Sequence, residues 1–144
     1  MKKILLINGA NLNRMHRRAP AFDDSGTTLD EIVHETREYA HSQGFDLDHF
    51  QSNHEGAIVD KLQEADGVYD GIIINPGPFT QYSHAIRVTL GSLPMPTVEV
   101  HLVNIFKTGE PSIPGRNATC VIAGLGKACY LLGVDAIRLA LSSK

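Results

Sequence analysis

The sequence predicts an α/β fold: a flavodoxin-like, doubly wound sheet of five parallel strands between two layers of helices, a three-layer α/β/α arrangement. Short β-branched runs alternate with longer segments of helical period along the whole chain, which is typical of a parallel sheet. The runs at 3–8 and 71–75 are almost wholly apolar, which indicates strands buried on both faces. With 144 residues, we expect one domain, 1–144.

The expected strands and helices follow from this alternation. Thr28 and Glu31 form a capping-box pair, after which apolar residues recur on one face of a helix that ends near Gly44. The strands are expected at 3–8, 45–50, 71–75, 97–102 and 119–123. A second helix is marked by Ile58, Val59, Leu62 and Ala65 and stops before Asp66, and later helices are expected at 80–90 and 128–141. The first strand should lie in the sheet centre. The polar stretch 9–26 is long for a βα connection, so we expect a functional loop there.

Composition narrows the classes of partner. The formal net charge of −3 gives no overall electrostatic reason to expect nucleic-acid binding, so a small molecule is favoured. The apolar runs are too short to cross a bilayer and no export signal is visible, so we expect a cytoplasmic protein. Cys120 and Cys129 lie in apolar segments and favour core positions over a disulfide or a metal site. Metal-type spacings are missing, and no metal site is predicted.

Polar residues gather where strands end, and ligands of doubly wound sheets bind at that edge. They are Asn8, Asn11, Asn53, Glu55, Asn75, His101 and Asn104. His101 is the leading candidate for acid–base chemistry. Glu99 stands two residues earlier on the same strand, so both side chains should share one face and the carboxylate could orient the imidazole. The alternative is a structural histidine.

Other features allow two interpretations each. The turn at 75–78 could present an amide to a ligand or serve only as a turn. Arg18 could clamp a carboxylate or be solvated. The glycines of 124–126 suit a tight strand-to-helix turn better than a phosphate loop, since the full fingerprint is missing. The remaining strand and helix histidines lack ligand spacing and are expected at the surface: His34, His41, His49 and His84.

Six motifs, in order over nearly the whole chain, resemble the type II 3-dehydroquinate dehydratase family. They are 7–13 (INGANLN), 51–56 (QSNHEG), 75–77 (NPG), 98–101 (VEVH), 124–126 (GLG) and 130–132 (YLL). The resemblance implies a cofactor-free lyase of the shikimate pathway that converts 3-dehydroquinate to 3-dehydroshikimate through an enolate. It also implies a homo-oligomer, a dodecamer built from trimers.

Site residues follow from the resemblance by position. Arg18 matches a lid arginine, His101 the general acid and Glu99 its orienting partner. Asn11 and Asn75 match two amide side chains of the family site. From this match we expect Asn11 to be catalytic and Asn75 to bind the substrate. The other expected substrate-binding residues are Gln81, Leu102, Val103 and Arg87.

Several positions depart from the family pattern. The lid tyrosine that removes the C2 proton is absent, and Asp23 falls nearest its place, so we include Asp23 as a candidate base. Gln81 stands where a histidine is common, Val103 replaces a serine, and Val88 replaces an aspartate that reaches a neighbouring subunit. A histidine-alanine-arginine run and a later arginine are also missing after Asn104.

These departures leave three hypotheses. The first is a dehydratase with an altered lid. The second is a divergent enzyme that acts on another hydroxylated carboxylate, because the changes cluster at hydroxyl and carboxylate recognition. The third is a non-catalytic protein that binds small molecules on the same fold.

Overall fold

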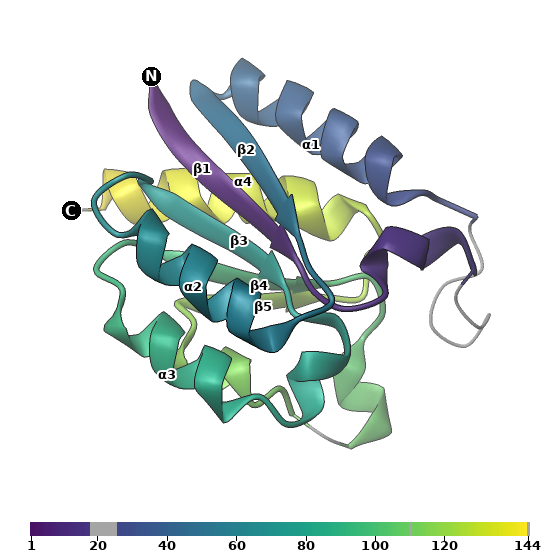
Figure 1. The fold of residues 1–144 in the computed structure, drawn as a ribbon. Helices are drawn as coiled ribbons and strands as arrows, with labels where there is room; N and C mark the ends of the chain where they lie inside the picture. Colours follow the sequence, from purple (N-terminus) through teal and green to yellow (C-terminus); the bar gives the residue numbers. More distant parts are fainter. Residues whose placement is uncertain (18–25, 110, 144) are drawn as a thin grey trace.

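The computed structural model describes residues 1–17, 26–109 and 111–143. Its five strands pair in parallel in the order β2-β1-β3-β4-β5, which is the flavodoxin-like order and confirms the predicted fold class (Figure 1). The strands are β1 Lys2–Asn8, β2 Phe45–Gln51, β3 Gly71–Asn75, β4 Thr97–His101 and β5 Cys120–Ala123. β1 lies between β2 and β3, and its residues 4–8 are buried, as the apolar run predicted.

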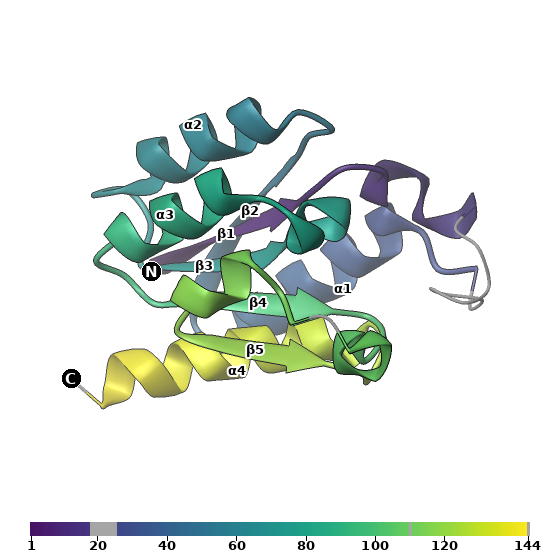
Figure 2. The ribbon, with the colours of Figure 1, turned by 90° about the horizontal axis from the view of Figure 1, so that it is seen from below.

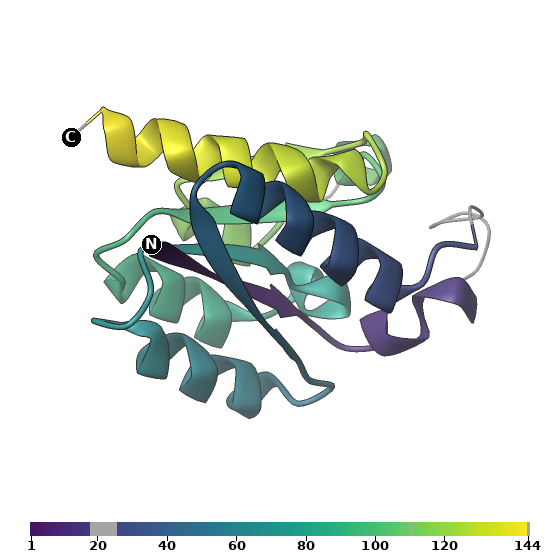
Figure 3. The same cartoon turned by 90° about the horizontal axis from the view of Figure 1, so that it is seen from above.

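Two helices cover each face of the sheet. Figure 2 shows α2 (Glu55–Ala65) and α3 (His84–Ser92) on one side, and Figure 3 shows α1 (Leu29–Ser42) and α4 (Ala128–Ser142) on the other. Alternation along β1 separates the two cores, because Ile4 and Leu6 pack with α1 and α4 while Leu5 and Ile7 pack with α2 and α3.

Capping side chains set the starts of α1 and α3. Thr28 Oγ1 accepts a hydrogen bond from the backbone N–H of Glu31 at 3.2 Å, so α1 begins where its capping box predicts. The prediction for 80–90 was wrong at its start. Residues up to Gln81 belong to a 3-10 helix, η2 (Gly77–Gln81), and α3 begins only after Ser83, whose Oγ accepts from the N–H of Ile86 at 3.0 Å.

The stretch after β1 is more ordered than a plain loop. It contains a 3-10 helix, η1 (Leu12–Arg17), whose Leu12 and Met15 side chains are each only 1% exposed. These two residues join the core beneath α1 and α4, so this part of the stretch is anchored to the fold. Arg18 and Asp23 lie outside the described residues.

The connections after β1 and β3 pack directly on each other at the carboxyl end of the sheet. The N–H of Gly9 donates to the carbonyl of Asn75 at 2.8 Å. A Cβ at position 9 would stand 2.1 Å from the carbonyl oxygen of Pro76, so only glycine fits this backbone approach. η1 and a further 3-10 helix, η3 (Ile105–Thr108), lie at this same end (Figures 1 and 2).

The structure also shows where the glycines of 124–126 and the two cysteines lie. The glycines of 124–126 form the tight turn between β5 and α4, with positive φ at Gly124 and Gly126. Cys129 is buried, Cys120 is partly buried, and both are free thiols. Within the described ranges, no helix is long and apolar enough to cross a membrane, and no group of three His, Cys, Asp or Glu side chains could hold a metal ion.

Candidate functional site

His101 and Glu99 form a buried hydrogen-bonded pair at the carboxyl end of β4. The Nε2 atom of His101 lies 2.8 Å from Oε2 of Glu99, so the predicted sharing of one face is confirmed. Glu99 is 0% exposed and His101 is 6% exposed. Because Nε2 faces the carboxylate, a proton that His101 exchanges with a ligand would pass through Nδ1.

A serine and a glycine distant in sequence complete the surroundings of Glu99. Ser112 Oγ donates to Oε1 of Glu99 at 2.9 Å, and the backbone N–H of Gly115 donates to Ser112 Oγ at 3.0 Å. Both carboxylate oxygens therefore have partners, as a buried charge requires. Sequence reasoning missed both residues. The available signal was the Ser-Ile-Pro-Gly turn at 112–115, but nothing local links that turn to β4.

A second buried network lies on the opposite face of the sheet. Asn75 Nδ2 donates to the hydroxyl of Tyr130 at 2.9 Å, and that hydroxyl donates to Asn8 Oδ1 at 2.6 Å. Asn75 Oδ1 accepts from the N–H of Gly77 at 3.1 Å. Asn75 is thus held between β1 and α4, on the face away from His101. One Nδ2 hydrogen and one Oδ1 lone pair remain for other partners.

The amides after β2 hold the backbone that follows β1. Asn11 has a left-handed φ of 67°, which asparagine tolerates better than most residues, and its N–H donates to Asn53 Oδ1 at 3.0 Å. Gln51 Nε2 donates to both the carbonyl of Gly9, at 3.2 Å, and Asn53 Oδ1, at 3.1 Å. The motif 51–56 therefore fixes the motif 7–13, and the Asn11 side chain is exposed at the carboxyl edge.

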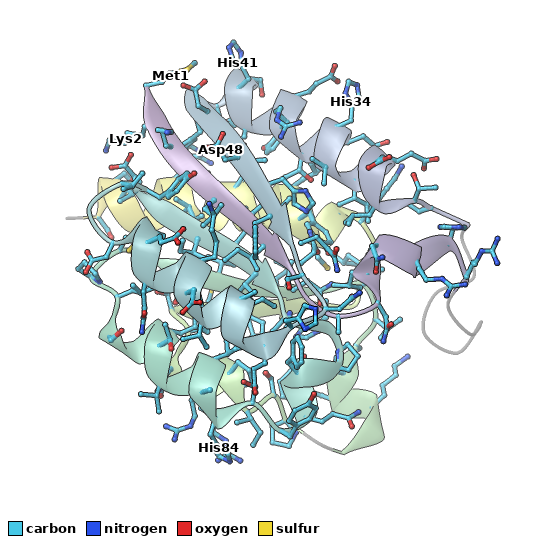
Figure 4. All side chains as sticks on the ribbon, viewed as in Figure 1. Met1, Lys2, His34, His41, Asp48 and His84 are labelled. Carbon is cyan, nitrogen blue, oxygen red and sulfur yellow. The ribbon has the colours of Figure 1, made fainter. Side chains whose placement is uncertain are left out.

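The expected substrate-binding residues lie in different surroundings. Leu102 and Val103 follow β4 directly, and the carbonyl of Leu102 accepts from the N–H of Gly126 at 2.9 Å. Gln81 is exposed at the end of η2. Arg87 lies on α3, where its Nε donates at 3.1 Å to Nδ1 of His84, a residue at the rim of the molecule (Figure 4).

His49 corrects the prediction that the unassigned histidines lie at the surface. His34, His41 and His84 are exposed, but His49 is partly buried and its Nε2 lies 3.1 Å from Nδ2 of Asn8. Burial, helped by the positive charge of Arg37, lowers the pKa of His49 from 6.5 to about 4.

We expect His49 to make folding stability sensitive to acid. The unfolded chain takes up a proton at His49 near pH 6.5 and the folded chain only near pH 4, so its contribution is fully present above 6.5 and is lost as the pH falls toward 4. The loss is at most about 3 kcal/mol, from about 1.36 kcal/mol per pKa unit. Urea unfolding of wild type and His49→Gln at several pH values measures it, since glutamine cannot titrate. Equal losses of stability in both proteins across this window would contradict the assignment.

Comparisons with known proteins agree with this geometry. Residues 2–138 match the family described as dehydroquinase class II. The chain is 50% identical over 140 residues to a 3-dehydroquinate dehydratase of Bacillus cytotoxicus, covering 95% of each protein. The crystal structure of a type II dehydroquinase from Butyrivibrio crossotus superposes with a TM-score of 0.89 at 37% identity, covering 95% of this chain and 97% of that one. A second, from Propionibacterium acnes, gives 0.89 at 31% identity, covering 96% and 97%.

Proposed function

This chain belongs to the class II dehydroquinase family, and we propose that it is a lyase that dehydrates 3-dehydroquinate to 3-dehydroshikimate. The observation that carries the proposal is the buried Glu99–His101 pair at the carboxyl edge of the sheet. A doubly wound fold binds its ligands at this edge. The Glu99 carboxylate holds the imidazole ring of His101 in one orientation, which favours proton transfer to a bound ligand.

The proposed reaction consists of two proton transfers. A base removes the proton next to the ketone, and the electron pair moves to the ketone oxygen to give an enolate. The enolate then re-forms the ketone as the carbon–carbon double bond forms and the bond to the hydroxyl group breaks. His101 gives its proton to that departing oxygen, which leaves as water. Neither step needs an external electron donor or acceptor. We therefore propose that no cofactor takes part.

The substrate-binding roles belong to the same proposal. Asn11 and Asn75 supply amides, the N–H groups of Leu102 and Val103 bind the substrate carboxylate, and the other expected groups are Arg18, Gln81 and Arg87. Asn75 suits its role because the Tyr130 hydroxyl and Gly77 fix the orientation of its side chain. We further propose one cytoplasmic domain that assembles as a trimer-based dodecamer. Apolar side chains exposed on α3 and α4 support assembly: Val88, Leu132 and Leu139.

The growth of enone absorbance with purified protein and 3-dehydroquinate tests the function. We expect measurable turnover, and folded protein that gives none even at high substrate concentration would contradict the proposal. Ligand screening would then separate another hydroxylated carboxylate substrate from a binding role without catalysis. Light scattering on the same preparation tests the assembly, and a monomer at all concentrations would contradict it.

A further inference from the structure

We propose that Ser112 is a positioning residue that holds Glu99 in the orientation in which it bonds His101. Its kinetic consequence rests on the proposed dehydratase function, whereas its structural consequence does not. Ser112 is 4% exposed and lies in the connection between β4 and β5, whereas Glu99 and His101 lie on β4 itself.

The hydrogen bonds around Ser112 give its hydroxyl a defined direction. The N–H of Gly115 donates to Oγ, which occupies an acceptor site, and the hydroxyl hydrogen is donated to Oε1 of Glu99. Oε1 is thereby satisfied and Oε2 is left for His101. Without the serine hydroxyl, Oε1 would be buried without this partner. The carboxylate would then rotate toward another partner, and that rotation disturbs the His101 bond.

The turn that carries Ser112 is fixed to two other elements. The N–H of Ile113 donates to the carbonyl of Thr80 in η2 at 2.9 Å. Asn117 ends the 3-10 helix η4 (Pro114–Asn117), and its Nδ2 donates to the carbonyl of Arg87 in α3 at 3.0 Å. The serine is therefore presented from a braced segment, as precise positioning requires.

Gly115 gives independent support for the same inference. A Cβ at this position would stand 2.9 Å from Oε2 of Glu99, the oxygen that bonds His101, and 3.1 Å from Cβ of Ser112. Cγ2 of Val121 would stand at 3.0 Å, so a larger residue would displace Glu99, Val121 or Ser112. The turn 112–115 thus places the Ser112 hydroxyl against Oε1 of Glu99, and the glycine at position 115 leaves space for Oε2.

The test compares Ser112→Ala with Ser112→Thr, which keeps a hydroxyl, and with Ser142→Ala, a matched loss of an exposed hydroxyl on α4. We expect Ser112→Ala to lower kcat by about 10- to 100-fold, the worth of a hydrogen bond to a charged group, with a smaller change in KM. Ser112→Thr should recover most of the loss, and Ser142→Ala should match wild type. Gly115→Ala, which keeps the hydroxyl but crowds Oε2, should also lower kcat.

A spectroscopic measurement separates this inference from the proposed function. The ¹⁵N chemical shifts of the His101 ring report which nitrogen carries the proton and need no turnover. We expect Nε2 to carry the proton that faces Glu99 in wild type, and a changed Nε2 shift in Ser112→Ala and Gly115→Ala. An inactive wild type with this change would refute the function and keep the positioning role. Folded Ser112→Ala with unchanged ring shifts, or an active wild type whose kcat Ser112→Ala leaves unaltered, would overturn the inference.

Discussion

Replacing His101 with glutamine should lower turnover by about 10²–10⁴-fold, the usual contribution of a general acid or base. Glutamine can still donate an N–H to the buried carboxylate of Glu99, so the fold should be kept while proton transfer is lost. His101→Ala should lose as much activity and also some stability. It leaves Oε2 of Glu99 without its 2.8 Å partner, and an unsatisfied buried group costs about 1–3 kcal/mol, more when it is charged.

The measurements are kcat from enone absorbance and the free energy of unfolding from urea titration. His34→Ala is the matched control, because His34 is an exposed histidine on α1 whose partner is Glu38 on the same helix (Figure 4). It should leave turnover unchanged. A His101→Gln variant that keeps near-wild-type kcat would remove His101 from the mechanism.

The fold could be predicted because its determinants are local. The five strands lie where short apolar or alternating segments predicted them, and the capping pair of Thr28 and Glu31 located the start of α1. The start of α3 was placed too early, because the apolar spacing of 80–90 continues through η2 and cannot show where a 3-10 turn gives way to an α-helix. Buried Leu12 and Met15 were missed, since isolated apolar residues in a polar stretch have no period.

The site could be predicted only where the residues in contact are close together in the sequence. Glu99 and His101 are two residues apart on a strand, so the period of two predicted their contact. Ser112 and Tyr130 reach their partners from other elements, and only the tertiary fold brings them there. His49 is different, because a signal existed: it continues the inward series of Phe45 and Leu47, which its expected surface placement overlooked.

The resemblance to the family leaves the base that removes the substrate proton unassigned, because Asp23 stands where the resemblance places a tyrosine. Asp23, Asp24 and Tyr82 are the candidates in this chain. Asp23 falls nearest the place of the missing tyrosine, but an unperturbed aspartate has a pKa of about 3.9 and is a weak base. Tyr82 precedes α3 beside Gln81 and is 57% exposed, and its ring forms a T-shaped contact with that of Phe79, with the centroids 5.9 Å apart. With any of these bases in place of the tyrosine, we expect weak turnover of 3-dehydroquinate, while substrate binding should be weakened less than turnover.

Asp23→Asn should therefore remove most of the residual turnover, by about 10²–10⁴-fold in kcat with little change in KM, because it deletes the base and keeps a side chain of the same size. Asp24→Asn removes the adjacent carboxylate and should leave turnover unchanged if Asp23 is the base. Tyr82→Phe deletes only a hydroxyl and should leave turnover unchanged if Asp23 is the base. The reverse result, loss in Tyr82→Phe and none in Asp23→Asn, would transfer the role to Tyr82. Turnover comparable to that of ordinary family members, and unchanged in all three variants, would show that none of the three residues is the base and would contradict the expected loss of a normal base.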